Sequence, residues 1–496
     1  MRRPVPHAVV VGAGLAGLSA AMHLAAGGRQ VTVLERAPTV GGLAAPVVAT
    51  GRGGAAYRLD TGPTVLTMPT LLARPFEALG EDLAAWVTLR RLDPAYRAHF
   101  ADGSTLDVTA DPATMAERIA GFAGASDAAG YLRYVDWVSS LYRVQFPAFV
   151  DRDVGSPLRL VRPALGRLVA LGGFGRWGPR VDRFVADERL RRVLSFQALY
   201  AGMSPARALA LYAVISYMDL VEGVYYPQGG MAALPVAMAA AAQAHGVQVR
   251  TDTPVTGVTW RGGRAVQVRT AERAWDCDEV VVTTDGPAAY RLLGRDGRRV
   301  ERRRPAPSCV VLAAGLTEAW DTAPTVHHSM HFGRAWEQTF ADLDAGRLMG
   351  DPSWLLSVPS VGDAGLAPRG GHVAYVLFPT PHLQVGPDAA QWQRLRGPYR
   401  ERILATLAAA GHPGFSGALD AEVLLTPTDW ADRGLAAGTP FAAAHTVAQT
   451  GPFRTPMRVA DNVVLAGAST HPGVGVPTVL VSGRLAARYL VQRRRA

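Results

Sequence analysis

The sequence predicts an α/β fold of two or more domains, organised around a parallel β-sheet. Three observations indicate this fold. The chain has 496 residues, 49% of them hydrophobic, which exceeds what one compact core usually holds. Residues 7–36 contain two short apolar runs separated by a helical stretch. Residues 463–480 predict another apolar strand, a tight turn rich in glycine and proline, and the start of a helix.

The composition excludes several classes of function. All 51 basic residues are arginines, and the lack of lysine excludes a Schiff-base mechanism and a Walker-type phosphate site. The net charge of +10 suits a nucleic acid, an acidic metabolite or an anionic membrane as a partner. No basic motif interleaved with aromatic residues and no zinc-ligand spacing supports a nucleic acid, so we expect none.

Cysteine usage and hydropathy favour a cytoplasmic protein. Cys277 and Cys309, the only two cysteines, give no disulfide framework, which suits a reducing compartment. The first residues lead almost directly into an apolar strand, so we expect no signal peptide. A spanning helix needs about 20 strongly apolar residues, and because no stretch meets this requirement we expect no transmembrane segment.

The N-terminal stretch predicts a dinucleotide-binding unit. Gly12, Gly14 and Gly17 have the G-x-G-x-x-G spacing and lie between the first strand, 8–11, and the helix, 15–26. Gly12 permits the tight turn, Gly14 lets a pyrophosphate approach the backbone, and Gly17 lets helix and strand pack closely. The free N–H groups at the start of the helix then face the phosphates.

Glu35 and the glycines after it extend this unit. Glu35 ends the second strand, 31–34, about 20 residues after the glycine motif, where a carboxylate accepts hydrogen bonds from ribose hydroxyls. Gly41 and Gly42 follow, and this pair resembles the extended fingerprint of two-domain FAD oxidoreductases. In many of those enzymes an arginine comes next, whereas Leu43 stands here.

The first unit by itself leaves alternatives open. FAD and NAD enzymes share this unit, so it does not choose between the two cofactors. The alternative is a glycine-rich turn between strand and helix that binds no ligand. Because Leu43 stands where many two-domain FAD oxidoreductases have an arginine, one phosphate or ribityl contact needs another cation. Arg36 and Arg58 are the candidates.

Four further segments carry a recognisable pattern. They are RLDTGPTVLTMP (58–69), VYYPQGGMAALPVAM (224–238), CDEVVVTTD (277–285) and LAGASTHPGVGVPTVLVSG (465–483). Together with the N-terminal unit they resemble the bacterial carotenoid desaturase family, and phytoene desaturases in particular. The resemblance extends over nearly the whole chain in the same order, and the C-terminal turn is its most specific part.

The resemblance implies an α/β fold with a Rossmann-like FAD-binding domain of the two-domain FAD oxidoreductase type. This domain is expected to be discontinuous, over residues 1–75, 222–300 and 440–496. An inserted α+β substrate domain would contain a helical, membrane-associating region over 76–221 and a substrate-binding sheet with helices over 301–439.

Sequence patterns place strands and helices within these regions. Two short strands across Gly262-Gly263 and a strand over 280–282 are expected in the FAD domain. The runs CVVLAAGL, WLLSVPS and HVAYVLFPT predict strands of the substrate sheet. The helical stretch 389–410 is expected to break at Gly397-Pro398.

FAD contacts are predicted in all three parts of the FAD domain. In related flavoproteins, backbone groups at the position of Val255 hold the adenine. No metal-binding residue is predicted. The predicted cofactor-binding residues are Gly12, Ala13, Gly14, Leu15, Ala16, Gly17, Glu35, Arg36, Gly41, Gly42, Leu43, Gly62, Pro63, Thr64, Val255, Asp285, Gly467, Ala468, Gly475, Val476 and Pro477.

The C-terminal turn is predicted to hold the flavin ring. Its strand is expected to join the parallel sheet beside the N-terminal unit. The helix after Pro477 is expected to point its positive end at the flavin N1 and C2 carbonyl. Gly473 and Gly475 let the backbone approach the ring. Ala468 follows Gly467 where many flavoproteins carry an aspartate, which matches the carotenoid desaturase pattern.

Residues 156–180 predict a surface that contacts a membrane. The segment has five arginines, no acidic residue and many leucine, valine and phenylalanine side chains. This composition suits a surface helix in a bilayer interface, with Trp177 at its boundary. A basic helix pair packed on the substrate domain is the alternative. Because a C40 hydrocarbon must be collected from lipid, we expect peripheral association with the inner face of the cell membrane.

Few polar residues qualify as catalysts. Asp60 is a candidate base, although a carboxylate beside a glycine turn more often caps that turn. Ser469 has no nucleophile elbow around it. His327, His328 and His331 alternate along an expected strand, which places His328 on the opposite face, so they need not converge on a metal. We expect this segment to line the substrate tunnel.

The resemblance implies an enzyme that desaturates phytoene toward neurosporene or lycopene. A hydride leaves an allylic carbon for flavin N5, and a proton leaves the neighbouring carbon. A quinone or oxygen is the expected electron acceptor, because no second dinucleotide fingerprint is present. The alternatives are a carotenoid isomerase, a desaturase of a hydroxylated or C30 polyene, a flavin amine oxidase, and a non-catalytic flavin-binding membrane protein.

Overall fold

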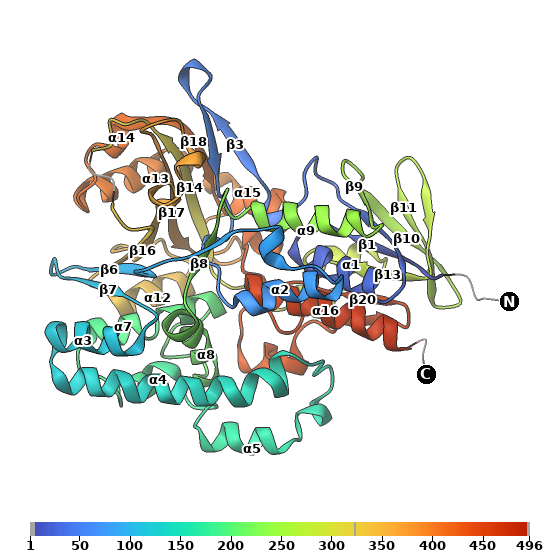
Figure 1. Cartoon of the computed structure of the whole chain (residues 1–496), viewed down its shortest axis with the longest axis horizontal. Helices are drawn as coiled ribbons and strands as arrows, with labels where there is room; N and C mark the ends of the chain where they lie inside the picture. The colour runs from blue at the N-terminus through green and yellow to red at the C-terminus, as the bar shows by residue number, and fades with distance from the viewer. Residues whose placement is uncertain (1–4, 322–323, 494–496) are drawn as a thin grey trace.

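The computed structural model describes residues 5–321 and 324–493. Residues 1–4 and 494–496 of the predicted FAD domain, and 322–323 of the predicted substrate sheet, lie outside these ranges. Two large sheets and a layer of helices make up the molecule, and both ends of the described chain lie on the side of the first sheet (Figure 1).

The first sheet has six strands and gathers distant parts of the sequence in the order β19-β20-β13-β1-β2-β9. It is parallel except for β19, and the predicted strands 8–11, 31–34 and 280–282 are confirmed. The C-terminal strand joins this sheet one place further out than predicted, because β13 lies between it and β1. The strands are β1 (His7–Val11), β2 (Gln30–Leu34), β9 (Gln248–Arg250), β13 (Glu279–Val282), β19 (Arg458–Ala460) and β20 (Val463–Leu465).

Helices cover one face of the first sheet, and a small antiparallel sheet covers the other. Val10 packs in one cluster with Leu18 and Leu480 of the helices, whereas Val9 packs in another with Val258 of the small sheet. Because both faces are covered, the central strands β1, β13 and β20 are almost entirely apolar. The helical side has α1 (Leu15–Ala26), α2 (Pro69–Ala78), α9 (Ala233–Ala244) and α16 (Val476–Arg493); the other side has β10 (Val255–Arg261), β11 (Arg264–Thr270), β12 (Ala274–Asp276) and α10 (Gly286–Leu292).

The second sheet has seven strands in the order β18-β14-β17-β16-β15-β6-β7. The three predicted substrate strands are confirmed as β14, β16 and β17. The prediction of a helical region over 76–221 misses β6 and β7, although burial of Tyr96, Ala98 and Phe100 follows the period of a strand. The strands are β6 (Tyr96–Phe100), β7 (Thr105–Val108), β14 (Ser308–Leu316), β15 (His328–Phe332), β16 (Trp354–Ser357), β17 (His372–Thr380) and β18 (Leu419–Leu425).

Helix α13 (Ala389–Ala409) packs on the second sheet as one continuous element, so the predicted break at Gly397-Pro398 is wrong. Proline removes the hydrogen bond to the carbonyl of Arg394. Both residues are exposed, so water can satisfy that carbonyl, while buried Ile403 and its neighbours hold the helix on the sheet. Further helices are α11 (Arg298–Glu301), α12 (Trp336–Asp344), α14 (Phe415–Ala418) and α15 (Pro427–Asp432).

The helical layer lies at the bottom of Figure 1, with α5 at its outer edge. Residues 156–180 form a short turn, α5 and α6, and not one long surface helix. Trp177 is fully buried and its indole N–H donates to Tyr134 at 3.2 Å, so its predicted place at a bilayer boundary is wrong. The layer contains α3 (Pro112–Ala123), α4 (Ala125–Gln145), α5 (Pro163–Ala170), α6 (Trp177–Val181), α7 (Glu188–Val193) and α8 (Val214–Tyr217).

Two small antiparallel pairs complete the strands. They are β3 (Val47–Thr50) with β4 (Ala56–Leu59), which projects at the top of Figure 1, and β5 (Leu89–Arg91) with β8 (Tyr225–Pro227). Among the described helices, none combines the length and the hydropathy needed to cross a membrane.

Candidate active site

One cavity of about 1050 Å³ runs from the carboxyl ends of the first sheet to the second sheet and to residues 156–174, here called the α5 segment. Small-molecule pockets usually have about 300–1,000 Å³, so this cavity is at the upper end of the range. All but two of the predicted cofactor residues line it. The exceptions are Ala13 and Gly17.

The first turn of α1 forms an anion-binding cradle at one end of the cavity. Gly14 is the N-cap residue of this helix and provides no side-chain cap, so the N–H groups of the first turn are open to a ligand. Gly12 has a φ of +102°, which favours glycine, and Gly14 bridges to Gly41 of the glycine pair. A Cβ on Gly17 would lie 2.0 Å from the Gly12 carbonyl oxygen, which is the packing role predicted for Gly17.

Glu35 is buried beside this cradle. Its Oε2 accepts the N–H of Ala13 at 2.7 Å and its Oε1 accepts the N–H of Ala37 at 2.9 Å. These bonds fix the carboxylate while each oxygen keeps a lone pair. A ribose with two hydroxyls fits this acceptor, so the cradle and Glu35 together fit the adenosine and pyrophosphate of FAD.

Replacing Glu35 with glutamine is expected to weaken FAD binding roughly 10–100-fold. The amide presents one acceptor oxygen in place of two, and a hydrogen bond to a charged acceptor contributes about 1.5–3 kcal/mol. Titration of the apoprotein with FAD, followed by flavin fluorescence, measures this change. The exposed Glu272 in the β11–β12 turn is the control, and an equal loss in Glu272→Gln would contradict a specific role for Glu35.

Of the two arginines predicted to replace the cation missing at Leu43, Arg36 lines the cavity and Arg58 does not. Arg36 lines the cavity and its guanidinium donates to the carbonyl of Arg433. Arg433 also lines the cavity, stacked over the Trp430 ring at 5.1 Å, whereas Arg58 is exposed on β4 and lies outside the lining. Sequence analysis missed Arg433, because no motif marks the residue after α15.

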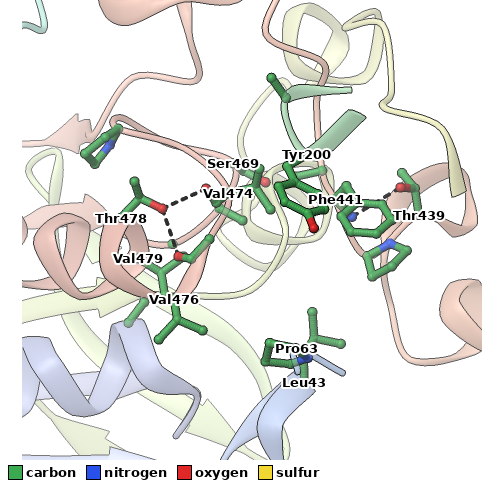
Figure 2. A pocket seen from close by; sticks show the side chains of 18 of the residues that line it. Leu43, Pro63, Tyr200, Thr439, Phe441, Ser469, Val474, Val476, Thr478 and Val479 are labelled. Atoms are coloured by element: carbon green, nitrogen blue, oxygen red, sulfur yellow. Dashed lines mark hydrogen bonds between the residues drawn. The ribbon is translucent and has the colours of Figure 1, made fainter. Parts of the chain in front are cut away.

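The C-terminal turn faces the cavity opposite Leu43 and Pro63 (Figure 2). Gly475 lines the cavity with a φ of +119°, and Thr478 donates to the carbonyls of Val474 at 2.7 Å and Gly475 at 2.8 Å. The N-terminus of α16 therefore points into the cavity, which suits the developing negative charge of a flavin ring.

Gly473 does not serve the close approach predicted for it. A Cβ at this position would lie 2.2 Å from Nε2 of His445, so the glycine makes room for a protein side chain. His445 is buried and lines the cavity beside the turn.

Arg454 holds the turn from behind and was missed by the sequence analysis. Its side chain is 2% exposed and donates to the carbonyls of Ala468 at 2.7 Å and Thr470 at 3.2 Å. Burial lowers the pKa of Arg454 to about 10, so it remains charged at neutral pH. Within the described residues it forms no ion pair, and carbonyl oxygens stabilise its charge.

Val255 and Asp285 complete the predicted contacts at the carboxyl ends of the strands. Both line the cavity. Asp285 caps α10, and its two oxygens accept the N–H groups of Gly286 and Ala436 at 2.8 Å each. The hydroxyl of Ser469 also donates to Asp285, which gives this serine a structural partner.

The far part of the cavity is apolar. One wall is the second sheet, where Tyr375, Leu377 and Pro379 of β17 face the cavity and the alternate Val376 and Phe378 face the α13 core. The opposite wall comes from the helical layer. Its aliphatic and aromatic residues include Leu160, Leu165, Leu168, Phe174, Leu209, Leu211 and Ile215.

Asp60 lies outside the cavity lining and both of its oxygens are occupied. The Tyr226 hydroxyl donates to Oδ2 at 2.5 Å and the Met231 N–H donates to Oδ1 at 3.0 Å. Burial raises the pKa of Asp60 to about 6. These contacts tie the segment before Gly62 to the start of α9, so Asp60 is not placed to contact a ligand.

The three histidines do not line the main cavity, but Met330 and Phe332 of the same segment do, so the segment lines the cavity through other side chains. His331 stacks between His99 and Trp354, with ring centroids 4.3 and 3.8 Å away. His328 accepts or donates a hydrogen bond with Ser357 at 2.6 Å. The described part of the chain holds no cluster of ligands suited to a metal ion.

Comparison with known proteins agrees with this geometry. Residues 15–491 match the model of flavin containing amine oxidoreductases. The chain is 52% identical to a phytoene dehydrogenase of Streptomyces griseus, covering 100% of this chain and 97% of the relative. It is 31% identical to the neurosporene-forming phytoene desaturase of Cereibacter sphaeroides, covering 99% and 95%. The chain belongs to the carotenoid desaturase family.

Solved structures show the same fold at low identity. An oxidoreductase of Methanosarcina mazei has a TM-score of 0.65 at 16% identity, covering 96% of this chain and 98% of the neighbour. Putrescine oxidase has a TM-score of 0.61 at 15% identity, covering 99% of both chains. The predicted α/β fold with a Rossmann-like FAD-binding domain is confirmed, and this member of the carotenoid desaturase family is an FAD-dependent oxidoreductase. Its domain boundaries and individual FAD contacts stay predictions.

Proposed function

We propose that this enzyme desaturates phytoene toward neurosporene or lycopene. The observation that carries the proposal is the joining of the dinucleotide cradle and an apolar chamber in one cavity of about 1050 Å³. A hydrocarbon without polar groups needs such a chamber, because it is held by burial of apolar surface alone. Relatives whose names state phytoene desaturation match the chain over 95% or more of its length.

The cofactor and two groups of residues share the tasks of this reaction. FAD, when bound, would accept the hydride, which carries both electrons of the oxidation. The aliphatic residues on β17 and in the helical layer orient the polyene along the cavity and exclude water. The C-terminal turn presents the positive end of α16 where negative charge develops.

Phytoene in liposomes is expected to bleach the flavin of the purified holoenzyme under anaerobic conditions, and expression in a phytoene-accumulating host is expected to yield coloured carotenes. Flavin absorbance and pigment chromatography measure the two effects. Putrescine, a hydroxylated carotene and a C30 precursor are the comparison substrates, and selective bleaching by one of them would replace phytoene as the substrate. Colourless cells with unchanged phytoene, despite soluble FAD-loaded protein, would refute the proposal.

We also propose that the α5 segment meets the inner face of the cell membrane. Leu158, Val161 and Val169 have exposed fractions of 82, 76 and 59%, while Leu165 and Leu168 of the same segment line the cavity. The arginines between them suit anionic headgroups. A lipid-dissolved polyene would thus enter near its binding chamber, and a membrane quinone or oxygen is the proposed electron acceptor.

Val161→Glu is expected to weaken binding to anionic vesicles severalfold. Removing this exposed apolar side chain and adding a negative charge both oppose contact with an anionic bilayer. Flotation of the holoenzyme with anionic and neutral vesicles at low and high salt measures the effect. Val48→Glu, at a 62% exposed valine on the distant β3 hairpin, is the control. Equal flotation of both variants under all conditions would contradict the proposed membrane face.

A further inference from the structure

Asp219 is a buried carboxylate in the wall of the active-site cavity. Asp219 is 5% exposed and lies on the helical turn Met218–Glu222 that follows α8. Among the described residues it accepts one hydrogen bond, from Nε2 of Gln197 at 3.2 Å, and it takes part in no ion pair. A carboxylate with so few partners is unfavourable in an apolar cavity, so its presence calls for a function.

One side of Asp219 adjoins the residues predicted to contact the flavin after β4. Thr67 contacts Met218, with Oγ1 and Sδ 3.9 Å apart, and Leu66 pairs with Tyr225 just beyond the turn. These contacts fix Asp219 close to the segment that continues from Gly62, Pro63 and Thr64, all of which line the same cavity.

The other side adjoins the C-terminal turn. Gln197 and Tyr200 lie on the short helix Phe196–Ala201, whose last carbonyl accepts the backbone N–H of His445 at 2.9 Å. His445 in turn fills the space left by Gly473. Tyr200 faces the cavity opposite Leu43 and Pro63 in Figure 2. Asp219 therefore lies between the two segments that enclose the flavin end of the cavity.

A small chamber of about 20 Å³ lies behind Asp219 and Tyr200. It is lined also by Tyr96 and His328, whose Oη and Nε2 are buried without a hydrogen-bond partner in the described structure. One water molecule needs at least about 10–15 Å³ and two to four polar partners, so this chamber suits a single water. Such a water would hydrogen-bond to both Asp219 and His328.

The groups that face Asp219 carry no positive charge that would stabilise its carboxylate. They are neutral: Gln197, Tyr200 from the same short helix, Tyr96 from β6, Tyr134 from α4 and, across the chamber, His328 from β15. Burial lowers the pKa of His328 to about 3, so it provides no positive charge at neutral pH. Burial raises the pKa of Asp219 to about 7, which suits a general base at neutral pH.

Gln197 can serve both protonation states of Asp219. Its Nε2 donates to the carboxylate, while its Oε1 is buried without a partner among the described residues. After rotation of the amide, Oε1 can accept the O–H of the carboxylic acid. An amide at this place therefore accommodates uptake of a proton without loss of the contact.

We propose that Asp219 accepts the proton that phytoene loses during desaturation, an assignment that rests on the proposed function. One C–H bond of the substrate breaks with transfer of hydride to the flavin. The neighbouring C–H bond breaks, its electron pair forms the new C=C bond, and its proton forms an O–H bond on Asp219. Release of this proton to solvent restores the carboxylate before the next turnover.

Asp219→Asn is expected to retain FAD and phytoene binding and to slow anaerobic flavin reduction by phytoene roughly 10²–10⁴-fold, the usual contribution of a general base. Reduction by dithionite should be unchanged. The wild-type rate should rise with pH through about 7, and the variant should lack this rise. Asp219→Glu, which keeps the carboxylate, should recover part of the rate.

A second readout is independent of turnover. Infrared difference spectra of the wild-type holoenzyme should show a carboxylic acid band that disappears as pH rises through about 7, and Asp219→Asn should lack it. The folded state binds this proton more tightly than the unfolded chain does. This contribution to stability is therefore lost, and the unfolding temperature of the wild type should decrease, as the pH rises from about 4 to about 7. Asp219→Asn should lack that contribution.

Asp127→Asn is the matched control. Asp127 is also 5% exposed, but its oxygens accept the N–H groups of Ala186 and Asp187 at 2.7 and 2.9 Å, and it lies outside the cavity lining. It should keep the wild-type rate and pH profile. Equal rates and profiles for Asp219→Asn and wild type would overturn the assignment, as would loss of bound FAD in Asp219→Asn. If phytoene does not reduce the flavin of the wild type, the proposed function is refuted. The infrared titration then still shows separately whether Asp219 takes up a proton near pH 7.

Discussion

Gly17→Ala is expected to yield protein that no longer retains FAD. The added Cβ would lie 2.0 Å from the Gly12 carbonyl oxygen and 3.1 Å from its carbonyl carbon, so α1 must move away from the phosphate-binding turn. Overpacking of this kind costs about 1–3 kcal/mol or more, and here the displaced backbone also forms the anion cradle. Flavin absorbance per protein after purification and the thermal unfolding temperature measure both effects.

Gly121→Ala is the matched control for this substitution. Gly121 also lies within a helix, α3, but no atom stands within 4 Å of the position of its Cβ. Alanine is expected to stabilise that helix by about 0.5–1 kcal/mol and to leave FAD retention unchanged. Full FAD retention in Gly17→Ala would contradict the close packing of α1 on the turn.

Arg454→Met is expected to destabilise the C-terminal turn and to lower FAD occupancy strongly. Methionine preserves much of the apolar stem but removes the donors to the carbonyls of Ala468 and Thr470. Each buried carbonyl that loses its partner costs about 1–3 kcal/mol, and the turn then no longer holds the start of α16 in place. FAD occupancy, unfolding temperature and protease sensitivity near the turn measure the loss.

Arg458→Met provides the comparison, because Arg458 lies four positions along the chain on β19. Its side chain is 55% exposed and pairs with Asp461 at 4.0 Å, a contact worth about 0–1 kcal/mol. It should retain FAD and stability. Similar losses in both variants would show that the general positive charge of this region, and not the buried hydrogen bonds of Arg454, supports the turn.

The first sheet and its cradle were predictable because local sequence determines them. The spacing of Gly12, Gly14 and Gly17 prescribes a turn between strand and helix, and Glu35 follows at a fixed distance. Each of these features depends on residues a few positions apart or on the pairing of two neighbouring strands. The same locality explains why the three substrate strands were recognised from apolar runs.

The remaining features depend on contacts between distant segments. Arg454 and Asp219 have no local motif, and their contacts form only when β20, the helical layer and the second sheet surround the cavity. The break expected in α13 was wrong because tertiary packing of Ile403 and its neighbours overrides the local effect of Pro398. The position of Trp177 was predicted wrongly because a tryptophan suits both a bilayer boundary and a buried core.

The strand order of the first sheet has a consequence for the synthesis of this enzyme. β1 and β2 leave the ribosome early, but β13 and β20, which extend the sheet beside them, follow roughly 250 and 430 residues later. At about 5–20 residues per second, the N-terminal cradle waits tens of seconds for the turn that closes it. Tight retention of the cofactor thus distinguishes a completed chain from a truncated one.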